Sequence, residues 1–178
     1  MNPLIIVLIL GLLAAGSVGV EVISNDAFTR FDELFKKYGA KYNVPWQWLK
    51  AICMNESDLG QNSRVARGLE DPSDVEGSKS YDGLSWGIMQ LTLNTARMYN
   101  SVINEIALND PEISVSIAAQ YMAYLMRLKG DDLESIVRSY NGGPGWRNSS
   151  AKSLEMTAEY WARFNRNYAR VLNVQPDS

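Results

Sequence analysis

The chain has 178 residues, a formal net charge of −3 and a hydrophobic content of 46%. This length fits one compact domain with a short appendage, and the acidic balance argues against general nucleic-acid binding. The chain contains no histidine and one cysteine, so Ser–His and Cys–His nucleophiles and zinc sites of the ordinary kind are excluded. Carboxylates, tyrosines, amides and hydroxyls remain for chemistry, and these are the groups that a glycosidase uses.

The amino-terminal segment, residues 3–20, is an unbroken run of apolar and small residues. A helix of this length spans about 27 Å, close to the thickness of a hydrocarbon core. The missing basic start favours a retained membrane helix, whereas the small residues Ala14-Ala15-Gly16-Ser17 would suit cleavage of a signal peptide. We therefore expect an anchor or signal segment over residues 1–22 and one folded domain over residues 23–178.

The first half of this domain predicts two helices and a loop. Asn25-Asp26 is a suitable N-cap for a helix whose aromatic residues recur on one face as far as Tyr38. Pro45 suits the first turn of a second helix, which carries Glu56 near its end. The stretch 58–82 is mostly polar and predicts a long irregular loop; a short β segment is compatible with residues 60–84.

The second half predicts four more helices. They cover residues 91–100, the segment from Asn109-Asp110-Pro111 to Gly130, residues 133–140 and residues 154–172. No other strand, internal repeat or low-complexity linker is evident. The fold class is therefore predicted as all-α, with mainly helical packing.

Four short motifs follow one another along the domain. They are Asn55-Glu56-Ser57, Gly87-Ile88-Met89-Gln90, Tyr140-Asn141-Gly142-Gly143 and Asn167-Tyr168. Glu56 follows three apolar residues, and burial among such residues raises the pKa of a carboxyl group toward neutrality, as a proton donor requires. Each motif taken alone also fits an ordinary turn, helix end or core residue. Their order and company make them informative.

From about Phe28 to Leu172, these motifs resemble the superfamily of lytic transglycosylases and goose-type lysozymes, which cleave bacterial peptidoglycan. The resemblance implies a lysozyme-like helical domain with Glu56 as the catalytic acid. It further implies that Ser57 positions the reacting sugar and that the hydroxyl of Tyr168 hydrogen-bonds Glu56. The remaining residues expected to line the cleft and contact the saccharide are Gly87, Met89, Gln90, Tyr140 and Asn141. Ile88, Ser139 and Ala169 depart mildly from the family pattern.

The resemblance leaves two reactions open. A lytic transglycosylase needs one carboxyl group, which first donates a proton and then takes one from the muramic-acid O6 hydroxyl to close an anhydro ring. A hydrolase normally needs a second carboxylate, for which the sequence offers Asp58, Asp74 and Asp82. The first reaction is favoured, and neither one requires a metal or another cofactor.

The expected partner is the glycan strand of peptidoglycan. Residues 3–20 are expected to attach the protein to a membrane, and no nucleic-acid binding is expected. The expected location is a membrane, with the domain facing the periplasm and cell wall, or a virion of phage origin; the alternative is secretion after signal cleavage. A wall opener of a secretion system would also suit the small size. Two other classes stay open, a non-catalytic wall-binding protein and a membrane-anchored interaction module. The sequence predicts no oligomeric state.

Overall fold

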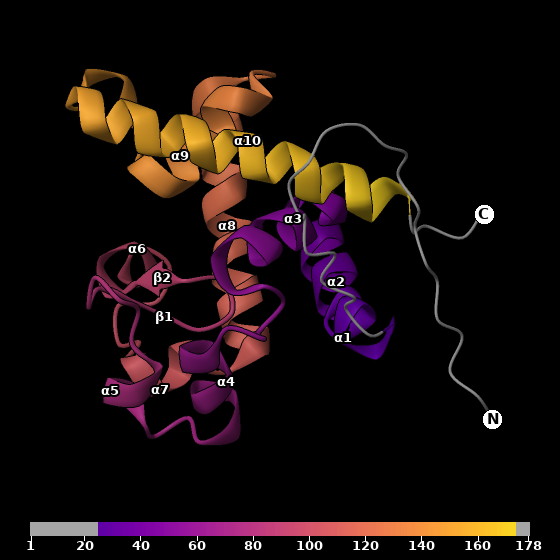
Figure 1. The fold of residues 1–178 in the computed structure, drawn as a ribbon, viewed down its shortest axis with the longest axis vertical. Helices are drawn as coiled ribbons and strands as arrows, with labels where there is room; N and C mark the ends of the chain where they lie inside the picture. Colours follow the sequence, from indigo (N-terminus) through magenta and orange to yellow (C-terminus); the bar gives the residue numbers. More distant parts are fainter. Residues whose placement is uncertain (1–24, 174–178) are drawn as a thin grey trace, which may run out of the picture.

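The structure is a computed structural model that describes residues 25–173, and Figure 1 shows its arrangement. The described part is mainly helical, as predicted, with two short strands. In chain order its elements are α1 (Asn25–Thr29), α2 (Asp32–Tyr42), α3 (Trp46–Ser57), α4 (Ser63–Glu70), α5 (Val75–Ser78), β1 (Ser85–Trp86), β2 (Leu91–Thr92), α6 (Leu93–Arg97), α7 (Glu105–Leu108), α8 (Pro111–Lys129), α9 (Leu133–Gly142), the 3₁₀ helix η1 (Trp146–Asn148) and α10 (Ala151–Asn173).

Helix α3 carries the first motif and packs against α2 on one side and α10 on the other. Pro45 precedes its first residue with a φ of −55°, which is the conformation that its ring imposes. The helix ends at Asp58, whose φ of 52° is left-handed, so Glu56 lies in the last turn. The predicted helix and the position of Glu56 within it are confirmed.

Helix α8 runs through the middle of the molecule and packs against α2 and α9 (Figure 1). The Asp110 side chain caps its start by accepting hydrogen bonds from two backbone N–H groups of the first turn. Gly130 ends it with a φ of 63°. Both boundaries agree with the prediction from the sequence, and the final helix α10 is confirmed with one extra turn at its start.

The prediction of an irregular loop over residues 58–82 is wrong, because this segment contains α4 and α5. The side chain of Asn62 accepts a hydrogen bond from the backbone of Arg64, and that of Asp74 accepts one from Gly77, so each short helix has a capped start. Arg67 of α4 also forms an ion pair of 2.8 Å with Asp74. These local bonds offset the poor helix propensity of the serines and glycines.

The β segment allowed within residues 60–84 lies just beyond that range. Strands β1 and β2 pair antiparallel, with Ser85 opposite Thr92 and Trp86 opposite Leu91. They flank the Gly-Ile-Met-Gln turn, and the helix expected over residues 91–100 therefore begins only at Leu93 and ends at Arg97.

The single helix expected after Asn25-Asp26 is divided into α1 and α2 at Phe31, although its aromatic face is buried as predicted. The apolar segment 3–20 lies outside the described residues, so the anchor or signal helix stays a prediction. Between residues 25 and 173, no helix combines the length and the apolar character needed to cross a membrane.

Candidate active site

Glu56 lies where the last turn of α3 meets α10, and it remains partly exposed. Its Oε1 atom accepts a hydrogen bond of 2.5 Å from the hydroxyl of Tyr160, a residue of α10 that is almost fully buried. Burial raises the pKa of Tyr160 well above its ordinary value, so this hydroxyl keeps its proton and acts as the donor. One oxygen of the carboxyl group is thereby fixed in position.

The surroundings of Glu56 raise its pKa to about 7. Burial is the largest cause, and the negative charge of Asp82 adds to it. The hydrogen bond from Tyr160 and the positive charge of Arg163 act in the opposite direction. A carboxyl group with a pKa near 7 can donate a proton and accept one at neutral pH, which is the requirement for acid–base catalysis.

The tyrosine that contacts Glu56 is Tyr160 and not the expected Tyr168. Tyr168 lies eight residues further along α10 and stacks on Phe164 with a ring distance of 5.7 Å. It is partly buried and packs against the hydrophobic core. The geometry therefore assigns Tyr168 to packing, and the expected hydrogen bond from Tyr168 to Glu56 is wrong.

Asn55 joins the two helices that form the site, a role that the sequence did not reveal. Its Nδ2 atom donates to the backbone oxygen of Tyr160 at 3.0 Å. Its Oδ1 atom accepts from Asn167 at 2.7 Å. These two bonds fix the position of α10 relative to α3, next to the contact between Tyr160 and Glu56.

Ser57 is almost fully buried, and its hydroxyl is used inside the protein. It donates to the backbone oxygen of Ile88 at 2.8 Å and accepts from the backbone N–H of Gly60 at 3.0 Å. The expectation that Ser57 contacts the reacting sugar does not agree with this geometry. Its hydroxyl instead ties the end of α3 to the Gly-Ile-Met-Gln turn.

That turn is formed by left-handed residues at both ends, Gly87 with a φ of 75° and Gln90 with a φ of 45°. A Cβ atom at position 87 would lie 1.9 Å from the backbone oxygen of Leu108, so only glycine fits. Met89 is fully buried and cannot touch a ligand, whereas Gln90 is partly exposed. The Nε2 atom of Gln90 donates to the backbone oxygen of Gly87 at 2.9 Å, which leaves its carbonyl oxygen for a ligand.

Tyr140 and Asn141, at the end of α9, differ in their surroundings. Tyr140 is buried, and its hydroxyl donates to the backbone oxygen of Met89 at 2.9 Å. Burial is the main reason that its pKa is raised well above the ordinary value, and the charge of Glu56 contributes next. The Asn141 side chain is exposed and able to meet a ligand. Tyr140 therefore holds the turn beside Glu56, and Asn141 lies at the surface.

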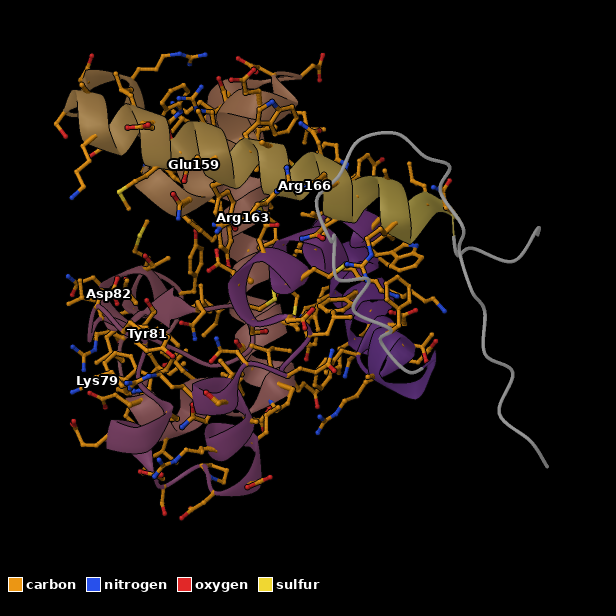
Figure 2. The ribbon with its side chains drawn as sticks, viewed as in Figure 1. Lys79, Tyr81, Asp82, Glu159, Arg163 and Arg166 are labelled. Atoms are coloured by element: carbon orange, nitrogen blue, oxygen red, sulfur yellow. The ribbon has the colours of Figure 1, made fainter. Side chains whose placement is uncertain are left out.

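Two parts of the chain carry charged and aromatic side chains on the elements around the site, and the charges of Asp82 and Arg163 act on Glu56. Figure 2 shows Glu159, Arg163 and Arg166 along α10, and Lys79, Tyr81 and Asp82 on the segment before β1. Asp82, the carboxylate whose charge raises the pKa of Glu56, accepts a hydrogen bond of 3.1 Å from the backbone of Leu84.

The other two carboxylates that the sequence offered have structural positions. Asp74 caps α5 and pairs with Arg67, and Asp58 ends α3. Asp82 is the carboxylate of the three whose charge contributes to the raised pKa of Glu56.

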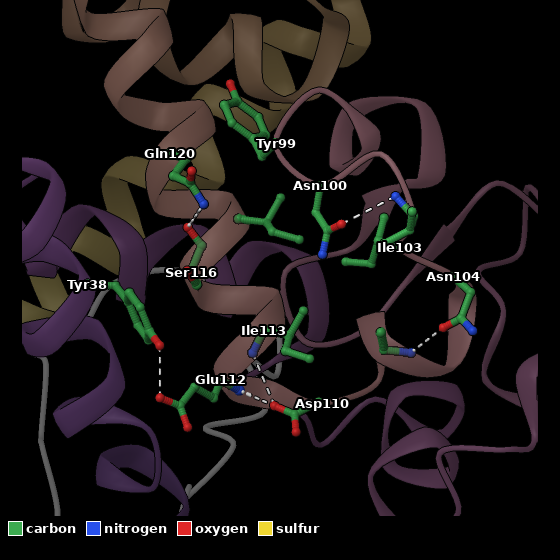
Figure 3. A pocket seen from close by; sticks show the side chains of 13 residues that line it. Tyr38, Tyr99, Asn100, Ile103, Asn104, Asp110, Glu112, Ile113, Ser116 and Gln120 are labelled. Atoms are coloured by element: carbon green, nitrogen blue, oxygen red, sulfur yellow. Dashed lines mark hydrogen bonds between the residues drawn. The ribbon is translucent and has the colours of Figure 1, made fainter.

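A cavity of about 560 Å³ lies elsewhere, between α2, α8 and the segment 99–107, as Figure 3 shows. Residues of the four sequence motifs are absent from its lining. Its carboxylates are engaged: Asp110 caps α8, and Glu112 accepts a hydrogen bond of 2.8 Å from Tyr38. Within residues 25–173, no three acidic or cysteine side chains gather as a metal site would require.

Comparison with known proteins places these residues in a family context. Residues 33–164 match the family described as "Transglycosylase SLT domain".

Two proteins described as "Soluble lytic murein transglycosylase", from Escherichia coli strain K12 and from Escherichia coli O157:H7, are similar to the chain. Each is 28% identical over 138 residues, which cover 72% of this chain and 19% of the relative. The chain thus corresponds to about a fifth of the length of these relatives. No solved structure is significantly similar to it.

Proposed function

The chain belongs to the SLT transglycosylase family, and on this premise we propose that it is a peptidoglycan lytic transglycosylase with Glu56 as its single acid and base. The observation that carries this proposal is the Glu56 carboxyl group, which is partly exposed, fixed at one oxygen and raised in pKa to about 7. Such a group is protonated in a large fraction of molecules at neutral pH.

In the proposed reaction, Glu56 donates its proton to the glycosidic oxygen between N-acetylmuramic acid and N-acetylglucosamine as that bond breaks. The N-acetyl group of the substrate stabilises the positive charge on the muramic-acid C1. The Glu56 carboxylate then removes the proton from the O6 hydroxyl, and O6 bonds to C1. The products are a free glucosamine end and a 1,6-anhydro-muramyl end, and Glu56 recovers its proton.

Tyr160 decides which oxygen of Glu56 takes part. Its hydrogen bond occupies Oε1, and Oε2 accepts no hydrogen bond within the described part of the chain. Oε2 is therefore the oxygen that we assign to proton transfer. Because Tyr160 donates to Oε1 in both protonation states, it fixes the carboxyl group through the two steps of the reaction.

Three partly or fully exposed residues are suited to hold the saccharide. The carbonyl oxygen of Gln90 and the amide of Asn141 can hydrogen-bond sugar hydroxyl or N-acetyl groups. Tyr81 is 81% exposed, and the Arg64 guanidinium lies 4.4 Å from its ring centre. Arg64 also donates to the backbone oxygen of Lys79 at 3.1 Å, so the ring of Tyr81 is a supported platform for a sugar.

Hydrolysis of the same bond is the second candidate, and Asp82 is the observation that favours it. Its charge acts on Glu56, and a carboxylate opposite the acid would activate water. A hydrolase would release a reducing muramic-acid end in place of the anhydro end.

We also propose that the domain acts at the wall side of a membrane, held there by residues 3–20, in phage entry or lysis or in wall opening for secretion. The support is the apolar sequence of that segment together with a substrate that lies outside the cytoplasm. Fractionation of cells that express the full chain would test the location. Recovery of the intact chain in the cytosol would contradict it.

The test of the reaction is mass spectrometry of purified peptidoglycan digested with the full chain. We expect anhydro-muramyl products from the unmodified protein and none from Glu56→Gln, which keeps the shape of the side chain and removes the transferable proton. Glu155→Gln changes an exposed carboxylate on α10 and is the matched control, with full activity expected. Reducing ends would establish hydrolysis, and an active, folded Glu56→Gln protein would contradict both reactions.

A further inference from the structure

One face of α10 carries a narrow line of charged residues. Glu159, Arg163, Arg166 and Arg170 are spaced by four, three and four positions, which places them within about 60° of one another around the helix. All four are exposed, whereas Tyr160, Phe164 and Val171 on an adjoining face are buried against the rest of the domain. Figure 2 shows the first three of these charged residues along the helix.

Arg163 is the member of this line that lies beside the active site. Its Cζ atom lies 5.7 Å from the ring centre of Tyr160, whose hydroxyl contacts Glu56. Its positive charge also acts on the Glu56 carboxyl group, although the two groups are not within ion-pair distance. A ligand held at Glu56 would therefore meet the guanidinium of Arg163.

The Arg163 guanidinium lies over the Tyr160 ring, but neither the Arg163 nor the Arg166 side chain forms an ion pair or a hydrogen bond with another described residue. Among the arginines of residues 25–173, Arg64, Arg67, Arg138 and Arg147 donate hydrogen bonds to protein groups, and the others, Arg163 and Arg166 among them, have no such bond. The bonds of the first four reach backbone oxygens, hydroxyls and carboxylates. Arg163 thus presents unused donors beside Glu56, and Arg166 presents further ones about one turn along α10.

We propose that Arg163, together with Arg166, binds a carboxylate of the muramic-acid residue that occupies the active site. This inference rests on the proposed function. Of the two sugars joined by the scissile bond, only muramic acid carries an acidic substituent, the lactyl group and the peptide attached to it. A guanidinium binds a carboxylate with two parallel hydrogen bonds, so it can recognise this substituent from the edge of the site. The carboxylate belongs either to the lactyl group of peptide-free glycan or to the stem peptide.

The test compares Arg163→Gln, Arg166→Gln and the unmodified full chain on three substrates. These are peptide-bearing glycan, glycan from which an amidase has removed the peptides, and peptide-bearing glycan whose carboxylates have been converted to amides. Arg127→Gln, an exposed arginine of α8 whose charge acts on Tyr99, is the matched control. Arg163→Lys tests whether a point charge can replace the planar fork.

For Arg163→Gln we expect kcat/KM to fall about fivefold to tenfold on substrates with carboxylates, mainly through KM, because an exposed charged hydrogen bond is worth little more. Arg166→Gln should lose less, Arg163→Lys should recover part of the loss, and Arg127→Gln should lose nothing. On the amidated substrate, Arg163→Gln and the unmodified chain should be equal. A loss confined to the peptide-bearing glycan would assign the carboxylate to the stem peptide. A loss confined to the peptide-free glycan would assign it to the lactyl group, whose carboxyl is in an amide bond while the peptide is attached, and a loss on both would show that Arg163 accepts either carboxylate.

The same loss on the amidated substrate would overturn the proposal, because Arg163 would then act on Glu56 and not on the substrate. Calorimetric binding of the three glycans to Glu56→Gln, with and without Arg163→Gln, makes the test independent of turnover. If the unmodified chain cleaves none of the glycans, the proposed function fails. If it cleaves all three and Arg163→Gln changes nothing, only the carboxylate site fails.

Discussion

The hydroxyl of Tyr160 donates a hydrogen bond of 2.5 Å to Glu56, and its backbone oxygen accepts one of 3.0 Å from Asn55, the residue before Glu56. A single residue of α10 thus holds both the acid and its neighbour on α3. The orientation of the carboxyl group therefore depends on the packing of these two helices.

The first prediction concerns Tyr160→Phe. The change removes one hydrogen bond to a group that becomes charged, so we expect kcat to fall about tenfold. It should also raise the pKa of Glu56 further, because that hydrogen bond lowers it. Steady-state kinetics across pH would show the lower rate, with the alkaline decline shifted to higher pH. Tyr168→Phe is the control on the same helix, and a larger defect in that variant would return Tyr168 to the site.

The second prediction concerns the pH dependence of activity. The first step needs protonated Glu56, whose pKa is about 7 in the folded protein. We therefore expect kcat/KM to decrease as the pH rises through about 7, with a slope of one proton. Every variant that keeps Glu56 as the acid should show this decline in kcat/KM. A kcat/KM that stays constant over about two pH units on either side of 7 would contradict the assignment of Glu56 as the acid.

The third prediction concerns stability and uses the same pKa. Because the pKa of Glu56 is about 7 when folded and 4.5 ordinarily, the folded state binds this proton more tightly. Its contribution to stability is full below pH 4.5 and is lost as the pH rises through 7, by about 3 kcal/mol in total. The Glu56→Gln variant does not lose stability in this way, because glutamine does not ionise.

Relative to the unmodified protein, we therefore expect Glu56→Gln to have a similar free energy of unfolding near pH 4 and a higher one near pH 8, by up to about 3 kcal/mol. Denaturant unfolding at the two pH values measures the difference. Glu155→Gln should show no such dependence on pH. A difference that is equal at both pH values would argue that Glu56 is not buried enough to act as the acid.

The fourth prediction separates structure from substrate binding at Ser57. Ser57→Ala removes a buried donor to Ile88 and an acceptor for Gly60, so we expect a loss of about 1–3 kcal/mol in the free energy of unfolding. KM should stay close to its original value because the hydroxyl faces no ligand. Thermal unfolding and kinetics together check this, with the exposed Ser149→Ala as control. A raised KM with unchanged stability would restore Ser57 as a sugar contact.

The fifth prediction concerns Gly87. Gly87→Ala places a Cβ atom against the backbone of Leu108 in a left-handed conformation, so we expect a loss of about 3 kcal/mol or more. Gly130→Ala is the control, because that glycine also has a positive φ, 63°, but has open space around it, so its loss reports backbone strain without a steric contact and should be smaller. Equal losses in denaturant unfolding would show that the backbone strain alone, and not the contact with Leu108, requires glycine at position 87.

The long helices were predictable because their ends carry strong local signals. Pro45 precedes α3, and α8 is capped by Asp110 at its start and by Gly130 at its end. Helices α4 and α5 were missed because their starts depend on single capping bonds within a glycine- and serine-rich stretch. The strands have two residues each, which is too short for any periodic pattern.

In the site, the sequence located the motifs but not the direction of each side chain. Tyr160 and Tyr168 both lie on the packed side of α10, and the position at which α10 crosses α3 decides which hydroxyl reaches Glu56. The point at which the two helices cross cannot be predicted from a single sequence. Ser57 was misassigned for a similar reason, because its contacts with Ile88 and Gly60 arise only once the chain has turned back on itself.

The Gly-Ile-Met-Gln turn is held by hydrogen bonds to its main chain as well as by the buried side chains of Ile88 and Met89. Ser57 and Tyr140 bond to the backbone oxygens of Ile88 and Met89, and the hydroxyl of Ser114 accepts from the backbone N–H of Met89 at 3.2 Å. Side chains from three separate helices, α3, α8 and α9, therefore bond to the backbone of the turn. Relatives can be expected to keep an aliphatic residue of similar size at position 88, because Ile88 is fully buried, and to keep the three anchoring side chains that bond to the main chain.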